Sequence, residues 1–180
     1  MSPKTSKNLN QISHAGSSTE NLFAKLTGFS PTSKSNDGDF IYKGSSIEVK
    51  KVTLNTKTRN GTINQIRALK NLVLVIHISN RRKWIVLDSR EVFSLVTSMK
   101  KRGQHCESPF ECCNISIANL RDAGLIEIPS KELKKKVISA VIRTRRDFKL
   151  KVLSQTLLHE NKVVAKKHHR LVQEALKTSN

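Results

Sequence analysis

The chain has 180 residues and a formal net charge of +19, with 33 lysines and arginines against 14 acidic residues. This length suits one domain with a sizeable core, and the basic surplus favours a polyanionic partner, nucleic acid ahead of an acidic membrane. Three cysteines, an odd number, argue against a disulfide framework. No apolar run is long enough to span a membrane and residues 1–18 lack the apolar core of a secretion signal, so we expect an intracellular, cytoplasmic protein.

Three regions follow one another along the chain. Residues 1–16 are rich in Ser, Asn and Lys and are predicted to form a mobile N-terminus. Residues 17–129 alternate predicted helices and strands, which indicates a core of the α/β or α+β class with a mixed sheet. Residues 130–180 are strongly basic, and we expect them to form helices that contact DNA, mediate dimerisation, or both.

The elements of the predicted core can be taken in chain order. Residues 21–26 indicate an amphipathic helix that ends near Gly28, and a loop over 30–37 follows. From residue 40 to 49 apolar and polar residues alternate, as in a half-buried hairpin whose turn is either Lys43-Gly44 or Gly44-Ser45. A polar loop, a short helix, two strands and a capped helix are then expected at residues 55–62, 63–70, 72–78, 84–87 and 88–99.

Asp39, Glu48 and Lys50 on this hairpin are the candidate site. If the turn is Lys43-Gly44, Asp39 faces Glu48 with Cβ atoms about 4.5–5.5 Å apart. If the turn is Gly44-Ser45, Asp39 faces Lys50 and lies diagonal to Glu48. Either turn keeps the three side chains on one face, whereas a three-residue loop would move Asp39 to the other face. The alternative to a functional site is a surface hairpin with an ion pair from Lys50 to one of the two carboxylates.

The three residue types suit metal-assisted phosphodiester hydrolysis. Two facing carboxylates repel each other unless a cation lies between them. A hard cation such as Mg²⁺ binds carboxylate oxygens, neutralises charge on phosphoryl oxygens and lowers the pKa of an attacking water. Lys50, beside Glu48 on the same face, is suited to orient that water or to stabilise the pentacovalent transition state.

At these residues the sequence resembles the PD-(D/E)xK nuclease superfamily, the restriction-endonuclease-like fold, over residues 17–100. Asp39 matches the first acidic residue, with Asp37 as a rival, and Glu48-x-Lys50 matches the ExK element, while Gly38 stands where the family has proline. The resemblance implies an αβββαβ core and cleavage of DNA with Mg²⁺, for which Mn²⁺ can substitute. It also implies that Asp39 and Glu48 are metal ligands and that Lys50 lies beside the scissile phosphate.

Two further residues are matched to supporting positions of this family. Many members carry a glutamate on the preceding helix, where Glu20 stands, and some carry a glutamine after the hairpin, where we select Gln65. Each has an ordinary alternative. Ser17-x-x-Glu20 is also a capping box. Asn64, Gln65 and Arg67 stand at the start of the expected helix over 63–70, and an exposed glutamine on the surface of a helix needs no functional role.

The function expected from the sequence is a Mg²⁺-dependent endonuclease that cleaves duplex DNA as a homodimer, most like a type II restriction enzyme. A homing endonuclease or a junction resolvase has the same core. The alternatives are a non-catalytic basic protein that binds nucleic acid and, on charge alone, an RNA-binding ribosome-associated factor. The side chains expected to contact DNA are Lys51, Lys57, Arg59, Arg67, Lys70 and Arg102.

A cluster of histidine and cysteine comprises His105, Cys106, Cys112 and Cys113. Adjacent ligands such as Cys112 and Cys113 point in divergent directions, unlike the spaced pairs of zinc sites. We therefore expect buried cysteines, or a segment that meets a DNA groove, rather than zinc. His77, inside an apolar strand, is expected to be a hydrogen-bonded core histidine.

Ser130 is predicted to cap a helix that runs toward Phe148. Beyond it, residues 150–175 show a weak heptad pattern, which leaves open a coiled coil, a helix packed on its own domain, or a basic tail that orders on DNA. The apolar stripe expected to be buried on the first helix is Leu133, Val137, Ile138, Val141 and Ile142.

Overall fold

The computed structural model describes residues 18–32, 38–70, 72–99, 106, 108–147, 174 and 177. Within these residues, five strands form a mixed sheet in the order β1-β2-β4-β5-β7, and β3 and β6 form a separate antiparallel pair. The strands are β1 (Phe40–Tyr42), β2 (Ser45–Val52), β3 (Thr62–Ile66), β4 (Val73–Ile78), β5 (Lys83–Leu87), β6 (Cys113–Ser116) and β7 (Ile128–Pro129). The helices are one at residues 18–27, the 3₁₀ helix η1 (Ser79–Arg81), α2 (Ser89–Thr97), α3 (Ile117–Asp122) and α4 (Ser130–Arg146). The expected mixed α+β class is confirmed.

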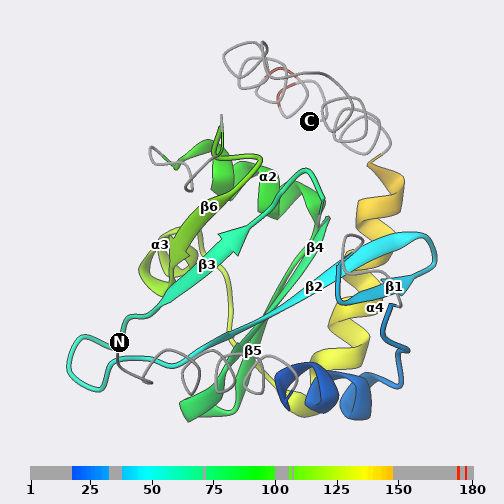
Figure 1. Ribbon diagram of the computed structural model, residues 1–180, viewed down its shortest axis with the longest axis horizontal. Coiled ribbons are helices and arrows are strands. Elements are labelled where there is room, and N and C mark those ends of the chain that lie inside the picture. The colour runs from blue at the N-terminus through cyan, green and yellow to red at the C-terminus, as the bar shows by residue number, and fades with distance from the viewer. Residues whose placement is uncertain are drawn as a thin grey trace, which may run out of the picture.

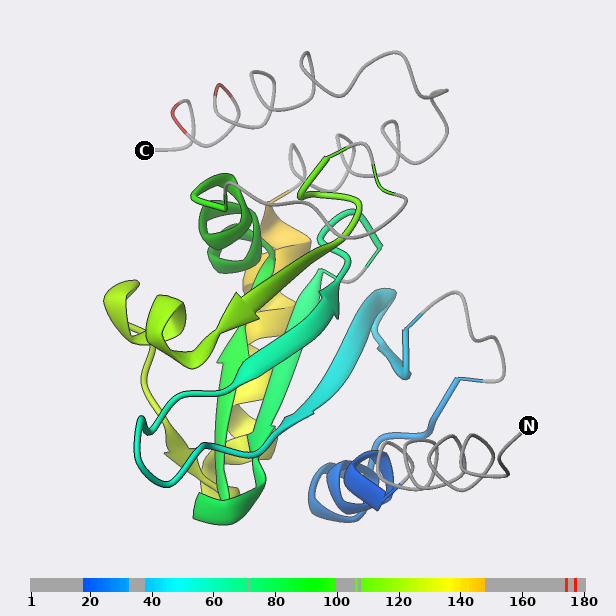
Figure 2. The same cartoon turned by 60° about the vertical axis from the view of Figure 1, so that its left-hand side comes forward.

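The five-stranded sheet has a hydrophobic core on each of its two faces. In Figure 2, α4 lies behind this sheet and the β3–β6 pair lies in front of it. The first face, here called the α4 face, packs Val73 and Val75 against α4 and the helix at residues 18–27, while the second, the β3 face, packs Leu74 and Ile76 against β3, β6, α2 and α3. All six residues of β4 are buried, because this central strand is covered on both sides.

The hairpin of β1 and β2 turns at Lys43-Gly44, the first of the two expected turns (Figure 1). Tyr42 pairs with Ser45 and Phe40 pairs with Ile47. Both turn residues have positive φ, 49° and 75°, as the two-residue turns that match the twist of antiparallel strands require. The hairpin therefore keeps the parity on which the candidate site depends.

The prediction of a short helix at residues 63–70 is wrong, because Thr62–Ile66 forms strand β3. This strand lies between β2 and β4 in the chain. Ile63 and Ile66 are both buried against the same core although they are three positions apart. The register of β3 against β6 shifts between these two residues, and Gln65 has a φ of 57°. Such a bulge adds one residue to a strand, so two inward residues take the spacing of a helix.

Helix α2 begins as predicted. Its N-cap is Asp88, whose side chain accepts from the Glu91 N–H at 3.0 Å, and Glu91 accepts from the Asp88 N–H at 2.8 Å. This reciprocal capping box satisfies two backbone donors that the helix cannot pair internally.

Helix α4 runs from Ser130 to Arg146, but its N-cap residue is Pro129 and Ser130 is not the cap. The Ser130 hydroxyl instead accepts a hydrogen bond from Trp84 Nε1 at 3.1 Å. Leu133, Val137 and Val141 are buried as expected, together with Ala140, whereas Ile138 is only partly buried and the side chain of Ile142 is 41% exposed. The buried stripe repeats every three or four positions from Leu133, and Ile142 falls outside it.

The helix at residues 18–27 ends at Gly28, as expected, where φ is 72° and the Gly28 N–H donates to the Ala24 carbonyl at 2.7 Å. Ser17, the first residue of the predicted capping box, lies outside the described residues, as do residues 1–16 and Phe148. None of the helices in the described part of the chain is both long and apolar enough to cross a membrane.

Candidate active site

Glu48 and Lys50 lie on the β3 face of strand β2. They pair in register with Leu74 and Ile76 of β4, whose side chains belong to the core of that face. Lys51, the next residue, pairs with His77 and points to the α4 face. Because successive side chains of a strand alternate, Glu48 and Lys50 share a surface from which Lys51 is excluded.

The backbone of Asp39 continues the hairpin one residue beyond β1. Its N–H donates to the Ile47 carbonyl at 3.0 Å, and its carboxylate Oδ2 accepts from the Val49 N–H at 2.7 Å. Val49 is the residue between Glu48 and Lys50, so this hydrogen bond holds the Asp39 carboxylate against the Glu48-x-Lys50 element.

The pKa of Asp39 is raised to about 6, chiefly because its carboxyl is desolvated by burial and then because the Glu48 carboxylate lies near it. The Val49 N–H opposes this rise, the Glu20 carboxylate adds to it, and the Lys50 ammonium opposes it. All of these groups are therefore close enough to act on the Asp39 carboxyl. The structure thus brings together three of the five side chains that the sequence suggested for catalysis, Asp39, Glu48 and Lys50. Glu20 acts on the Asp39 carboxyl only as a weaker nearby charge.

Lys50 Nζ forms an ion pair with Glu48 Oε1. The two side chains are 25% and 14% exposed, so the pair is shielded from bulk water on most sides but is still reachable by a ligand. An ammonium next to two carboxylates can neutralise only one of them, so the Glu48 charge adds to the rise in the Asp39 pKa that burial causes first.

Asp39 and Glu48 are the side chains of the candidate site that could hold a cation. Across the described residues, no group of three or more His, Cys, Asp or Glu side chains is arranged to hold a metal ion. Mg²⁺ commonly uses one or two protein carboxylates and fills its remaining positions with water and substrate phosphate. Asp39 and Glu48 would supply those two carboxylates.

The backbone at Gly38 excludes the proline that stands at this place in the pattern that the sequence resembles. The φ of Gly38 is 90°, and proline, which is locked near about −65°, cannot adopt that conformation. The Gly38 carbonyl accepts from Thr32 Oγ1 at 2.6 Å, and the Asp39 carbonyl accepts from the Thr32 N–H at 3.0 Å. The chain therefore approaches Asp39 through a glycine-dependent bend that Thr32 secures.

Gln65 is exposed on β3, in the second sheet, and not on a helix as expected. Its N–H donates to Asn114 Oδ1 of β6 at 3.1 Å, so its observed contact connects the two strands of that sheet. That its side chain supports a metal site stays a prediction.

The basic side chains predicted to contact DNA lie in different places. Arg67 and Lys70 are exposed in the segment after β3, and the Lys70 carbonyl accepts from Ser46 Oγ at 2.6 Å. Since Ser46 is two residues before Glu48 on the same strand, this bond brings that segment to the candidate site, a link that no local sequence pattern indicated. Lys57 and Arg59 are exposed on the loop after β2. Arg102 lies outside the described residues.

The cysteines of the proposed cluster form no disulfide among the described residues. Burial raises the pKa of Cys113 to about 12, and burial together with the Cys112 thiol raises that of Cys106. Thiols with raised pKa values are poor nucleophiles and poor metal ligands near neutral pH. His105 lies outside the described residues.

His77 is buried, as expected, and stacks on Trp84 with ring centroids 4.2 Å apart. Its Nδ1 has no hydrogen-bond partner within the described residues. The prediction of a hydrogen-bonded histidine is therefore wrong for this atom. Burial, followed by the nearby Lys51 ammonium, lowers the pKa of His77. The imidazole thus packs on a side chain of the α4-face core.

Comparison with known proteins identifies no family: no family model matches the chain, and no curated protein matches it. Support for a function comes from the geometry around Asp39, Glu48 and Lys50.

Replacing Asp39 with Asn is expected to raise the melting temperature at pH 7.5 by about 2–4 °C, measured without divalent cations. The raised pKa means that proton binding by Asp39 favours folding fully below pH 3.8, and that this contribution is lost as the pH rises through about 6. Above that range the ionised carboxylate costs stability, although partial exposure to water weakens the effect. The amide of the substituted side chain has no charge and keeps an oxygen for the Val49 N–H.

Thermal unfolding followed by circular dichroism at pH 7.5 and pH 3.5 checks this expectation. The gain should disappear at pH 3.5, where both forms are neutral at this position. A variant that melts below the parent protein at pH 7.5 would show that the ionised carboxylate stabilises the hairpin.

Proposed function

We propose that the chain is a Mg²⁺-dependent endonuclease that hydrolyses phosphodiester bonds of duplex DNA. The observation that carries the proposal is the placement of Asp39 against Glu48-x-Lys50, with its carboxylate on the Val49 N–H and its pKa raised to about 6. Partly buried like charges of this kind cost stability and are common at functional sites. The resemblance to PD-(D/E)xK nucleases assigns the same three residues to catalysis.

Each side chain has a distinct role in this proposal. Asp39 and Glu48 would hold Mg²⁺, with the Glu20 carboxylate close enough to add negative charge. Bound there, Mg²⁺ would neutralise charge on the phosphoryl oxygens and acidify a water molecule. Lys50, now paired with Glu48, would turn its ammonium to the phosphoryl oxygens, where charge grows in the transition state.

Duplex DNA is the proposed substrate because of the charge and its placement. The net charge of +19 favours a polyanion, and Arg67 and Lys70 lie on the segment that Ser46 connects to the candidate site. One site of this kind cuts one strand, so a homodimer would cut both strands of a two-fold target. This arrangement is most like that of a type II restriction enzyme.

Incubation of the protein with supercoiled circular DNA tests the proposal. We expect nicked and linear products with Mg²⁺ or Mn²⁺ and none with EDTA. Glu48→Gln, which removes a metal ligand but keeps the size of the side chain, should abolish cleavage. The matched control is Glu132→Gln, which makes the same substitution at an exposed position in the first turn of α4 and should cleave like the parent protein.

The competing function is a non-catalytic basic protein in which Asp39 and Glu48 only pair with neighbouring cations. It predicts salt-sensitive DNA binding without a product that depends on a divalent cation. Cleavage that survives Glu48→Gln would also reject the assigned site, because a contaminating nuclease or another site would then carry the activity.

A further inference from the structure

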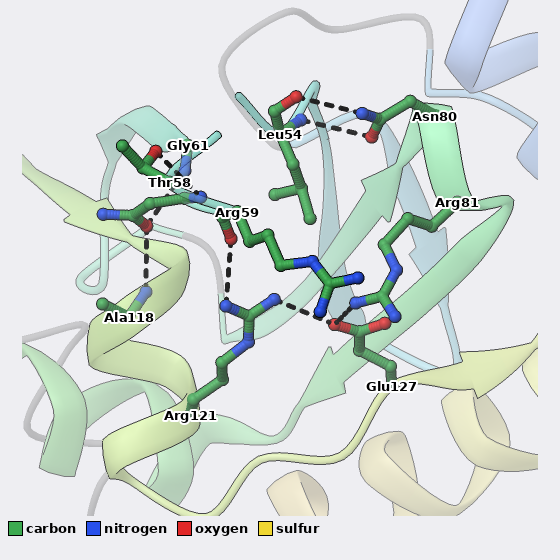
Figure 3. Close-up of polar contacts among 10 residues, drawn as sticks. Leu54, Thr58, Arg59, Gly61, Asn80, Arg81, Ala118, Arg121 and Glu127 are labelled. Carbon is green, nitrogen blue, oxygen red and sulfur yellow. Dashed lines mark hydrogen bonds and ion pairs between the residues drawn. The ribbon is translucent and has the colours of Figure 1, made fainter. Parts of the chain in front are cut away.

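A second group of basic side chains lies beyond the C-terminal ends of β2 and β4. Arg81 Nη1 and Arg121 Nη2 contact the same oxygen of Glu127, at 3.0 and 3.5 Å. Arg121 Nη1 also donates to the Arg59 carbonyl at 2.9 Å. Figure 3 shows the Arg59 side chain extending toward the Arg81–Glu127 pair. These four residues, Arg59, Arg81, Arg121 and Glu127, are called the arginine cluster below.

The loop that carries Arg59 is held on two sides. The Asn80 side chain binds both backbone groups of Leu54, accepting from its N–H at 3.2 Å and donating to its carbonyl at 3.0 Å. Asn60 Oδ1 accepts from the Ala118 N–H at 3.1 Å, at the start of α3 (Figure 3). The loop is therefore tied to η1 and α3, and binding a ligand there would cost little additional ordering.

The charges of the arginine cluster do not balance. The cluster has three guanidinium groups and one carboxylate, which pairs with Arg81 and Arg121, whose side chains are 46% and 39% exposed. Lys57 and Arg82, exposed near them in the chain, add positive charge, and Asp122, beside Arg121 on α3, adds one further carboxylate. Guanidinium groups with donors left for solvent match the geometry of phosphate oxygens.

We propose that the arginine cluster is a second contact for the DNA backbone, separate from the candidate active site. Strand β2 and the loop after it connect the two places. Leu54 lies at the start of that loop and is bound by Asn80, the neighbour of Arg81 in η1. The six steps from Glu48 to Leu54 span about 20 Å at about 3.3 Å per residue. One turn of duplex DNA is about 34 Å long. Phosphates within one turn of the scissile bond can thus reach the cluster, and they would position the duplex without reading its sequence.

The choice of DNA as the polyanion rests on the proposed function, whereas the test measures binding without a divalent cation and does not depend on cleavage. A fluorescently labelled duplex of 24 base pairs is titrated with the full chain at several salt concentrations, and anisotropy gives Kd. For Arg81→Ala we expect the slope of log K against log salt to fall by about 1 and affinity near 0.1 M salt to fall about eightfold. Lys25→Ala, with the same charge change at an exposed position of the helix at residues 18–27, is the matched control and should keep the slope of the parent protein.

Glu127→Gln separates phosphate binding from a purely structural ion pair. If the cluster binds phosphate, removing its carboxylate frees Arg81 and Arg121 and should tighten DNA binding and steepen the salt dependence. If Glu127 only holds the loops in place, the same change should weaken binding. The proposal is overturned by weaker binding of Glu127→Gln, by an unchanged slope for Arg81→Ala, or by an equal loss for Lys25→Ala. Circular dichroism of each variant verifies that it is folded.

Discussion

Lys50→Ala is expected to slow DNA cleavage about 100- to 1000-fold at saturating Mg²⁺, which is the range for removal of one preorganised electrostatic contact to a transition state. Lys50 contributes its ammonium on the β3 face, where it pairs with Glu48 and acts on the Asp39 carboxyl. Single-turnover nicking of circular DNA, with protein in excess, measures the effect on the chemical step. DNA affinity should change much less, since one cation among 33 is lost.

Lys51→Ala provides the matched control for this experiment. It removes the same charge from the adjacent residue of the same strand, but the Lys51 side chain points to the α4 face beside His77. We expect a change of no more than a few-fold. Equal losses in the two variants would mean that total charge, and not the position of the ammonium, controls the rate, and the role of Lys50 would then be rejected.

Leu133→Ala is expected to reduce the free energy of unfolding by about 2–5 kcal/mol, the range for large-to-small changes in a packed core. The Leu133 side chain is fully buried in the α4-face core, in the same cluster as Trp84 and Ile47. The expected loss includes the removed apolar contacts and the cavity that remains. Equilibrium unfolding in urea measures it.

Ile142→Ala, on the same helix, is the control for Leu133→Ala. Ile142 is 41% exposed, and we expect a loss below about 1 kcal/mol, as for most changes at exposed positions. If the two variants lose the same free energy, α4 does not form a layer of the folded core. If they differ as expected, the first part of the basic region at 130–180 is needed for the fold, whether or not it contacts DNA.

The effects expected for Lys50→Ala and Leu133→Ala concern opposite sides of strand β2. Ile47 and Val49 point to the core that α4 covers, while Glu48 and Lys50 point to the candidate site. Packing on the α4 face therefore holds the strand that presents the charged residues. For this reason the Leu133→Ala variant should be compared with the parent protein only at temperatures where both are fully folded.

Much of the candidate site could be predicted from local patterns. The alternation from Phe40 to Val49 and a two-residue turn that includes Gly44 place Asp39, Glu48 and Lys50 on one face by parity alone. The capping box of Asp88 and Glu91 likewise depends on residues three positions apart. The proximity of Glu20 was implied only by the family resemblance, and the raised pKa of Asp39 follows from burial that no short segment specifies.

The errors arose where distant segments determine the structure. A spacing of three between Ile63 and Ile66 is typical of a helix, yet pairing with β6 makes this segment a bulged strand. Ser130 has the residue type of a helix cap, but its hydroxyl accepts from Trp84, 46 residues earlier in the chain. In both cases a long-range partner satisfies groups that the local pattern had assigned to a neighbour.

The charge, the hairpin with its shared face and the start of α2 follow from the amino-acid sequence, because side-chain parity and capping act over a few residues. Long-range packing, in contrast, is what brings the segment of Lys70 to Ser46 at the candidate site, and Arg81 and Arg121 to Glu127. These contacts join residues far apart in the chain. They form when the sheet and its two cores bring distant loops together, and no local periodicity encodes that packing.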